Sequence, residues 1–210
     1  MKKKLALGVS VCLLSLGSIA QSTNEAVIWY QYNENIKLSE KWSAGLGFQY
    51  RDLVERDKDY HLFFSAGFTR ILPNGFSVGA GLMNLNVNQI VAEDYLLVPE
   101  MRPYQQVGYS AKFDKISFKW RFIAEERFIR NVENGKLISG HTFSFRFRNL
   151  SEIGIPVYKG FSLTAGTEIF FNAGGAPRLN VFDQDRTALL CNFPAGEWKL
   201  STGLGSAHWG

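Results

Sequence analysis

The sequence predicts an all-β protein, an antiparallel up-and-down transmembrane β-barrel of about 10–12 strands that follows a cleaved signal peptide. Three observations support this prediction. The first 20 residues have the composition of an export signal, the rest of the 210-residue chain alternates apolar with polar or small side chains, and 17 Phe, 8 Tyr and 5 Trp are spread along it. We therefore expect one β-barrel domain over residues 21–210.

Residues 1–20 predict a secretory signal peptide. Residues 2–4 are lysines, a largely apolar stretch runs to Leu16, and Ser18-Ile19-Ala20 is a small-x-small cleavage site. A membrane-spanning helix is the alternative, but the apolar stretch is shorter than the roughly 20 residues that a spanning helix needs. The sequence therefore predicts export of a mature chain that begins near Gln21.

The mature chain has almost no net charge and one cysteine. Cleavage removes three lysines and no acidic residue, which leaves 20 basic and 19 acidic residues, a net charge of +1. No basic block remains, so nucleic acid is not an expected partner. Cys12 lies in the signal and Cys191 is then single, so we expect neither an internal disulfide nor a cysteine zinc site.

Ten segments are predicted as strands from their two-residue period and their flanking turns. In chain order they are 25–38, 42–51, 61–70, 76–87, 100–113, 116–122, 137–150, 161–171, 182–193 and 198–207. Segment 42–51, "WSAGLGFQYR", is the clearest, because apolar residues occupy every second position from Trp42 to Tyr50. The first, fifth, ninth and tenth segments are weaker candidates.

Turn residues separate the segments. The turn sequences are "LPNG" at 72–75, "FDK" at 113–115, "VENGK" at 132–136, "NAGGAP" at 172–177 and "PAGE" at 194–197. Short links such as 72–75 and 113–115 alternate with longer ones at 51–60, 89–100 and 131–136. This alternation is typical of the periplasmic turns and external loops of a membrane barrel.

The two faces of the predicted strands differ in chemistry. In "HTFSFRFRNL", residues 141–150, three phenylalanines occupy one face, while Ser144, Arg146 and Arg148 occupy the other. In a membrane barrel the rings face lipid and the polar groups face the lumen. The same parity predicts a lumenal cluster of charged residues: Arg102, Lys119, Arg121, Glu125, Arg127, Arg146, Arg148, Glu168 and Arg186.

A charged group in a narrow lumen needs a partner, so we expect these residues to form an Arg/Glu ladder. Ile123 and Glu126 break the alternation, which predicts a bulge or a strand end near 124–127. Six large rings near strand ends are predicted as interfacial girdles: Trp29, Trp42, Tyr50, Tyr104, Tyr109 and Trp198.

Alternation alone is also compatible with a soluble lipocalin-like barrel or a sandwich, in which the apolar face is the core. The abundance of rings favours lipid contact, because so many would be hard to pack within one soluble core. A sheet in lipid must also close, since unpaired edge groups cost several kcal/mol each.

Five ordered motifs resemble those of a known family. They are "RPYQQ" at 102–106, "RFIAEERF" at 121–128, "FRFRNL" at 145–150, "EIFFN" at 168–172 and "FDQDR" at 182–186. The sequence resembles domain-of-unknown-function family 2490, uncharacterised outer-membrane β-barrels common in Bacteroidota. The resemblance implies a barrel with inward Arg and Glu residues and brings no activity, ligand or partner. Similar members continue through another strand that ends in an aromatic residue, so either a final strand is missing or Trp209 takes its place.

No catalytic, metal or cofactor site is predicted. His141 lies on the apolar face, opposite Ser144, and His61 stands four residues from Ser65, about 13 Å along a strand. Adjacent Glu125 and Glu126 face opposite ways, so they cannot flank one glycosidic bond. "DQD" at 183–185 lacks the glycine and final glutamate of a calcium loop.

The sequence thus predicts a protein of the bacterial cell outer membrane, of structural or narrow-pore transport type, with an Arg/Glu-lined lumen and no enzymatic activity. Its expected partners are outer-membrane lipid, lipopolysaccharide and the barrel-insertion machinery. Two alternatives stay open. One is a membrane-embedded hydrolase of lipid or lipopolysaccharide, and the other is a soluble periplasmic binding protein with a lipocalin-like cup.

Overall fold

A computed structural model describes residues 27–53, 60–91, 94–174, 181–195 and 198–209. The predicted signal peptide lies outside these residues. Ten strands follow one another in chain order: β1 (Val27–Lys37), β2 (Trp42–Leu53), β3 (Tyr60–Ile71), β4 (Phe76–Val91), β5 (Asp94–Phe113), β6 (Ile116–Glu133), β7 (Lys136–Tyr158), β8 (Phe161–Ala173), β9 (Phe182–Ala195) and β10 (Trp198–Trp209). A single 3₁₀ turn, η1 (Pro73–Gly75), is the helical element of the described part. No helix among the described residues is long and apolar enough to cross a membrane.

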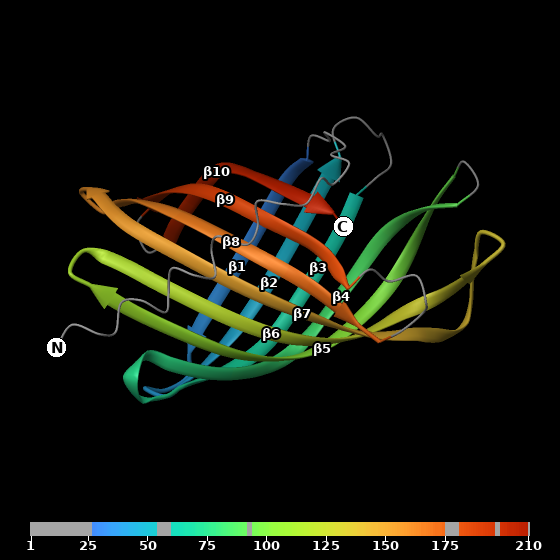
Figure 1. Ribbon diagram of the computed structural model, residues 1–210, viewed down its shortest axis with the longest axis horizontal. Helices are drawn as coiled ribbons and strands as arrows, with labels where there is room; N and C mark the ends of the chain where they lie inside the picture. Colours follow the sequence, from blue (N-terminus) through green and yellow to red (C-terminus); the bar gives the residue numbers. More distant parts are fainter. Residues whose placement is uncertain (1–26, 54–59, 92–93, 175–180, 196–197, 210) are drawn as a thin grey trace.

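Every strand pairs antiparallel with the next, so the sheet order is the chain order from β1 to β10. This confirms the predicted all-β, antiparallel, up-and-down fold. The sheet curls back on itself as a half-barrel, and β1 to β4 pass behind β7 to β10 in Figure 1. Among the described residues β1 and β10 are the two edge strands. The curl gives the sheet a concave face and a convex face.

The four central strands are the longest, and two of them overturn a predicted loop. β4 to β7 contain 16, 20, 18 and 23 residues. The predicted link at 89–100 is mostly strand, because β4 and β5 stay paired as far as Val91 and Asp94. The β4–β5 and β6–β7 hairpins extend beyond the other strands at one end of the sheet (Figure 1).

The irregularity predicted near 124–127 is also wrong. β6 and β7 keep one register from Ser117 opposite Gly154 to Arg130 opposite His141, and the shift comes only between Arg130 and Val132. Ile123 therefore lies on the concave face as an apolar residue among charges, and it is 2 % exposed. Glu126 lies on the convex face, where Gln105 donates a hydrogen bond to it at 3.4 Å.

Two of the predicted turns depend on residues that tolerate positive φ. In "LPNG", Asn74 and Gly75 have φ of 60° and 82°, and in "VENGK", Asn134 and Gly135 have φ of 48° and 73°. Asn-Gly is the pair that most readily adopts two consecutive left-handed residues in a tight hairpin. The first turn fixes the register of the β3–β4 hairpin, and the second fixes the β6–β7 register as far as the shift between Arg130 and Val132.

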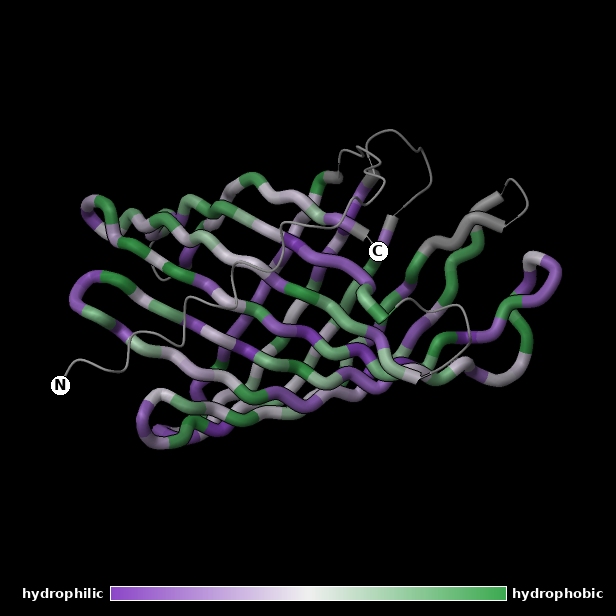
Figure 2. Tube along the Cα trace, in the orientation of Figure 1, coloured by the Kyte–Doolittle hydropathy of each residue, from purple (hydrophilic) through white to green (hydrophobic). Residues whose placement is uncertain are grey.

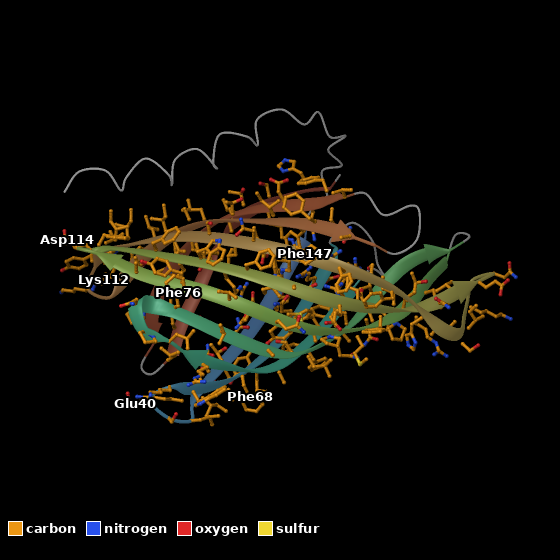
Figure 3. All side chains as sticks on the ribbon, turned by 60° about the horizontal axis from the view of Figure 1, so that its bottom comes forward. Glu40, Phe68, Phe76, Lys112, Asp114 and Phe147 are labelled. Atoms are coloured by element: carbon orange, nitrogen blue, oxygen red, sulfur yellow. The ribbon has the colours of Figure 1, made fainter. Side chains whose placement is uncertain are left out.

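The convex face is apolar and exposed, whereas the concave face buries polar groups. Figure 2 shows the hydropathy alternating along each strand, and Figure 3 shows Phe68, Phe76 and Phe147 on the outside of the curled sheet. Rings pack against one another on this convex face, such as Phe122 on Phe147 with centroids 6.0 Å apart. The buried residues in the described part include nine polar or charged ones but only four apolar ones.

Two rings predicted as girdle residues lie on the concave face instead. Trp29 pairs directly with Arg51 of β2, so both share this face. The Tyr104 hydroxyl lies close over Gly67 and Gly81. Trp42, Tyr50 and Tyr109 do lie on the convex face, and the side chain of Trp198 is outside the described set.

Candidate functional site

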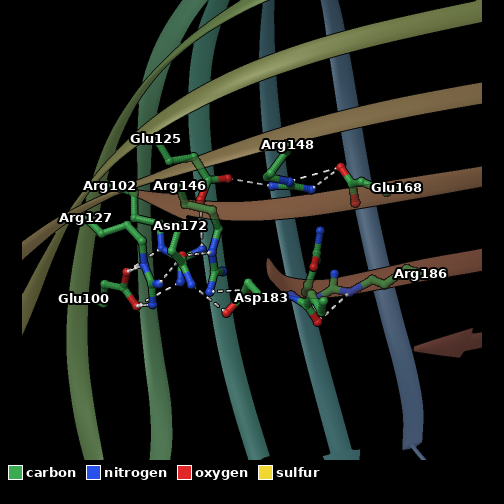
Figure 4. A network of polar contacts seen from close by, with 12 residues as sticks. Glu100, Arg102, Glu125, Arg127, Arg146, Arg148, Glu168, Asn172, Asp183 and Arg186 are labelled. Atoms are coloured by element: carbon green, nitrogen blue, oxygen red, sulfur yellow. Dashed lines mark hydrogen bonds and ion pairs between the residues drawn. The ribbon is translucent and has the colours of Figure 1, made fainter. Parts of the chain in front are cut away.

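The registers bring the polar side chains of β5 to β9 into rows across the concave face. One row places Tyr104, Glu125, Arg146 and Asn172 side by side on β5 to β8. The next contains Ile123, Arg148, Phe170 and Gln184 on β6 to β9. A third runs through Arg121, Leu150, Glu168 and Arg186. Arginines and acidic residues from neighbouring strands and successive rows thus come close to one another, as Figure 4 shows.

Glu100 of β5 is held between two guanidinium groups. Arg102 donates to both of its oxygens, from Nε at 2.7 Å and from Nη2 at 2.8 Å. Arg127 of β6 also donates to both, from Nε at 2.5 Å and from Nη2 at 3.2 Å. Bidentate pairs of this kind fix orientation as well as charge. All three residues are buried.

Glu125 links this group to a second one. Its Oε2 accepts from Arg102 Nη1 at 3.1 Å, and its Oε1 accepts from Arg148 Nη1 at 2.8 Å. Arg148 also donates to Glu168 Oε1 from Nε at 3.0 Å and from Nη2 at 2.7 Å. Arg121 lies 3.5 Å from the same carboxylate oxygen. One connected chain of ion pairs therefore crosses β5, β6, β7 and β8.

A branch reaches β9 through a β-bulge. The β8–β9 register shifts between Phe170 and Phe171, so Phe171 pairs with Phe182 and Asp183 joins Gln184 on the concave side. Asn172 donates to Asp183 Oδ1 at 3.0 Å. Arg146 contacts Asp183 Oδ2 at 2.8 Å. The bulge thereby adds the carboxylate of Asp183 to the polar groups of the concave face.

Two arginines on the strands next to the edge strands lie against aromatic rings. The Cζ atom of Arg51 on β2 is 4.1 Å from the Trp29 ring centroid, and the Cζ atom of Arg186 on β9 is 5.6 Å from the same centroid. The Cζ atoms of Arg186 and Arg148 also lie over the Phe170 ring, 4.6 and 5.0 Å from its centroid. Trp29 thus joins β1 and β2 to β9 across the concave space.

The centre of this network excludes water. Glu125 is 0 % exposed, and Phe170 and Ile123, which lie among the charges, are each 2 % exposed. In such surroundings an ion pair is strong, but an unpaired charge is costly. The paired arrangement therefore depends on each carboxylate keeping its arginines. We call the seven arginines and four carboxylates the concave cluster: Arg51, Arg102, Arg121, Arg127, Arg146, Arg148, Arg186, Glu100, Glu125, Glu168 and Asp183.

Eight of the nine residues predicted for the lumen belong to the concave cluster. The ninth, Lys119, is exposed and stands opposite Glu152 on the neighbouring strand. Sequence reasoning missed Glu100, Asp183, Arg51 and the bridging amide of Asn172. The alternation of segment 42–51 already places Arg51 on the polar face with Gln49, and Glu100 could have been found because it lies two residues from Arg102.

The other candidate groups give no comparable assembly. His208 lies 3.4 Å from Asp185 on the convex face, and His141 is exposed on the same face. Cys191 is a free thiol. Within the described ranges no three His, Cys, Asp or Glu side chains come together as a metal site.

Comparison with known families gives one match. The family described as "Protein of unknown function (DUF2490)" matches residues 26–205, which is most of the chain and includes every strand except the last four residues of β10. A search of curated proteins found no match.

Proposed function

We propose that this chain, which belongs to the DUF2490 family of proteins of unknown function, is a β-barrel protein of the bacterial outer membrane. Its interior is narrow and charged, and its role is structural or is the passage of small solutes. In this proposal residues 1–20 are the export signal. The partners are outer-membrane lipid, lipopolysaccharide and the barrel-insertion machinery.

The observation that carries the proposal is the inverted distribution of polarity. Large apolar side chains are exposed on every strand, including Phe64 at 51 %, Phe68 at 59 % and Leu204 at 86 %, while Glu125 is fully buried. A soluble protein avoids contiguous exposed apolar surface of this extent. Acyl chains are the environment in which an apolar exterior around a polar interior is stable.

The backbone supports closure of the sheet in that environment. β1 and β10 are edges, and an unpaired edge in lipid costs several kcal/mol for each unsatisfied group. Pairing of these edges, directly or through a further strand, completes the barrel. About ten strands enclose a narrow interior, and the concave cluster occupies much of it. Small solutes and ions fit such a passage, whereas large solutes are excluded.

The test is electrophoretic mobility of the full-length protein taken from the outer-membrane fraction in mild detergent. The unboiled sample migrates faster than the boiled one if a closed, detergent-resistant barrel is present. Reconstitution of that sample for conductance then separates a pore from a structural barrel. A water-soluble protein without a heat shift would contradict the proposal, because its apolar face would then be a buried core.

The same reconstituted sample tests the absence of enzymatic activity. In this proposal the buried carboxylates are held in ion pairs and are not available as acids or bases. We expect no release of fatty acid from phospholipid or lipopolysaccharide. Hydrolysis that follows the protein through purification would contradict this part of the proposal.

A further inference from the structure

The concave cluster has three more arginines than carboxylates, and two of these arginines form no ion pair with a described carboxylate. Glu100, Glu125, Glu168 and Asp183 are each contacted by one or more of five arginines of β5 to β7. The five arginines are Arg102, Arg121, Arg127, Arg146 and Arg148. Two further arginines remain, Arg51 on β2 and Arg186 on β9. Among the described residues no carboxylate forms an ion pair with either of them.

The polar contacts of these two guanidinium groups are to neutral amides. Arg51 Nη2 donates to Gln49 Oε1 at 3.0 Å, and Arg51 Nε is buried without a hydrogen-bond partner in the described part. Arg186 donates from Nε and Nη2 to the single oxygen of Gln184, at 3.3 and 3.2 Å. Glu168, which stands opposite Arg186 in the β8–β9 register, and Asp183 attract this guanidinium without forming an ion pair with it. The protein groups around the two arginines therefore neutralise their charges only in part.

Trp29 holds the two cations near each other. Because their central carbons lie 4.1 and 5.6 Å from one ring centroid, these carbons are less than 10 Å apart. Both side chains are half-buried, so their repulsion is screened less than it would be in bulk water. A counter-anion in contact with both guanidinium groups would relieve this repulsion and accept hydrogen bonds from the unused N–H donors. Guanidinium forks bind the oxygens of phosphate, sulfate and carboxylate groups in this way.

We infer that Arg51 and Arg186, on the platform of Trp29, form a binding site for a small oxyanion carrying one or two negative charges. The inference deepens the proposed function, since it names the solute class that the interior would select, and its role in transport rests on that proposal. The site faces the concave space, away from the convex rings. A water-borne solute therefore reaches it more readily than the phosphate of a lipid headgroup.

The experiment is calorimetric titration of the full-length protein in detergent with inorganic phosphate at constant ionic strength. Wild-type protein binds phosphate. Arg51→Gln and Arg186→Gln each raise the dissociation constant about tenfold or more, since each removes charge-assisted hydrogen bonds. Lys119→Gln is the matched control. It removes the same charge from an exposed position on the same face, and it changes binding less than about twofold.

The inference is overturned if wild-type protein binds no phosphate or if all three variants lose binding equally. A parallel titration with phosphatidic acid in mixed micelles distinguishes the source, and binding of the lipid without binding of free phosphate also overturns it. The heat-shift gel is run on every variant. If a glutamine variant does not fold, Arg51→Lys replaces it. Lysine keeps the positive charge but lacks the paired N–H donors of the guanidinium group, so this variant must still bind phosphate more weakly than wild type.

The result is separable from the proposed function. A heat-shifted barrel that binds no phosphate contradicts the anion site and leaves the barrel proposal standing. A soluble protein that binds phosphate through Arg51 and Arg186 does the reverse.

Discussion

The concave face has two regions that differ in side-chain size, one with long charged side chains and the other with glycine and small polar residues. Over β5 to β9 it presents long side chains, such as Arg102, Glu125 and Arg148, joined by ion pairs. Over part of β2 to β4, away from Arg51, it presents glycines with Ser and Thr beside them, among them Gly67 and Gly81. The curl of the sheet sets one region across from the other (Figure 1). Small residues on one wall leave room for the large side chains of the other.

This difference shows that one alternation pattern can serve two roles. Both regions read in the sequence as polar or small positions between apolar ones. In the charged region the inward groups bind one another and fix the relative positions of neighbouring strands. In the glycine region they allow close approach, as the Tyr104 hydroxyl over Gly67 and Gly81 demonstrates.

The largest expected effect comes from breaking the charged region at its centre. Glu125→Gln removes the negative charge that Arg102 and Arg148 share. Removal of one partner from a buried ionic network costs about 3–5 kcal/mol. The measurement is the free energy of unfolding in urea. Glu126→Gln, one residue away on the convex face, is the control and changes it by less than about 0.5 kcal/mol. Equal losses in the two variants would contradict a special role for the network.

The convex face provides the next effect. If it lies in lipid, Phe68→Arg destabilises the refolded protein in vesicles by about 2–4 kcal/mol, the range for a basic residue near the bilayer midplane. Phe68→Leu, which stays apolar, costs about 1 kcal/mol or less. Unfolding from lipid vesicles measures both. Similar costs for the two substitutions would show that the position is not in contact with lipid.

The glycine region is tested by a pair of matched substitutions. A Cβ added at Gly67 would meet the Tyr104 hydroxyl and, at 2.8 Å, the Ala80 carbonyl oxygen, so Gly67→Ala costs about 1–3 kcal/mol of unfolding free energy. A Cβ at Gly45 has its nearest neighbour at 3.6 Å. Gly45→Ala therefore changes stability by about 0.5 kcal/mol or less. If both cost the same, close approach over β3 and β4 does not stabilise the fold.

The smallest effect concerns the contact that connects the two ends of the sheet. Trp29→Leu removes the ring against which Arg51 and Arg186 lie, and a partly buried cation–π pair contributes about 0.5–2 kcal/mol. Trp42→Leu removes a more distant pair with Arg70, at 5.7 Å on the convex face, and serves as the control. The Trp29 variant should unfold at lower urea concentration than the control. If the Trp42 variant unfolds at the lower urea concentration, the Trp29 contact stabilises the fold no more than an ordinary surface contact does.

The sequence predicted the alternation of faces well, because a strand has a fixed two-residue period. Phe143, Phe145 and Phe147 lie opposite Arg146 and Arg148 for this reason alone. The same rule placed eight charged residues on the face where the network forms. Parity cannot show which of them meet, since that depends on register between strands and on the curl of the sheet.

The misses have local physical causes. Asp183 was unpredictable because a bulge turns it toward the concave side, and bulges carry no reliable sequence signal. Glu100 was missed because it stands at the boundary between the predicted link 89–100 and the weak predicted strand 100–113, whereas pairing with β4 extends the strand back to Asp94. Ile123 was misread as a defect, whereas it is a buried apolar contact within the charged network.

The most direct test of the account determines which face of the sheet meets lipid. In a Cys191→Ser background, single cysteines at positions 64, 66 and 68 on the convex face and 65 and 69 on the concave face of β3 are labelled with a fluorophore in vesicles. We predict that brominated lipid quenches the first set and that water-soluble iodide quenches the second. A reversed pattern, or quenching without alternation, would contradict an apolar exterior in the membrane around a charged interior.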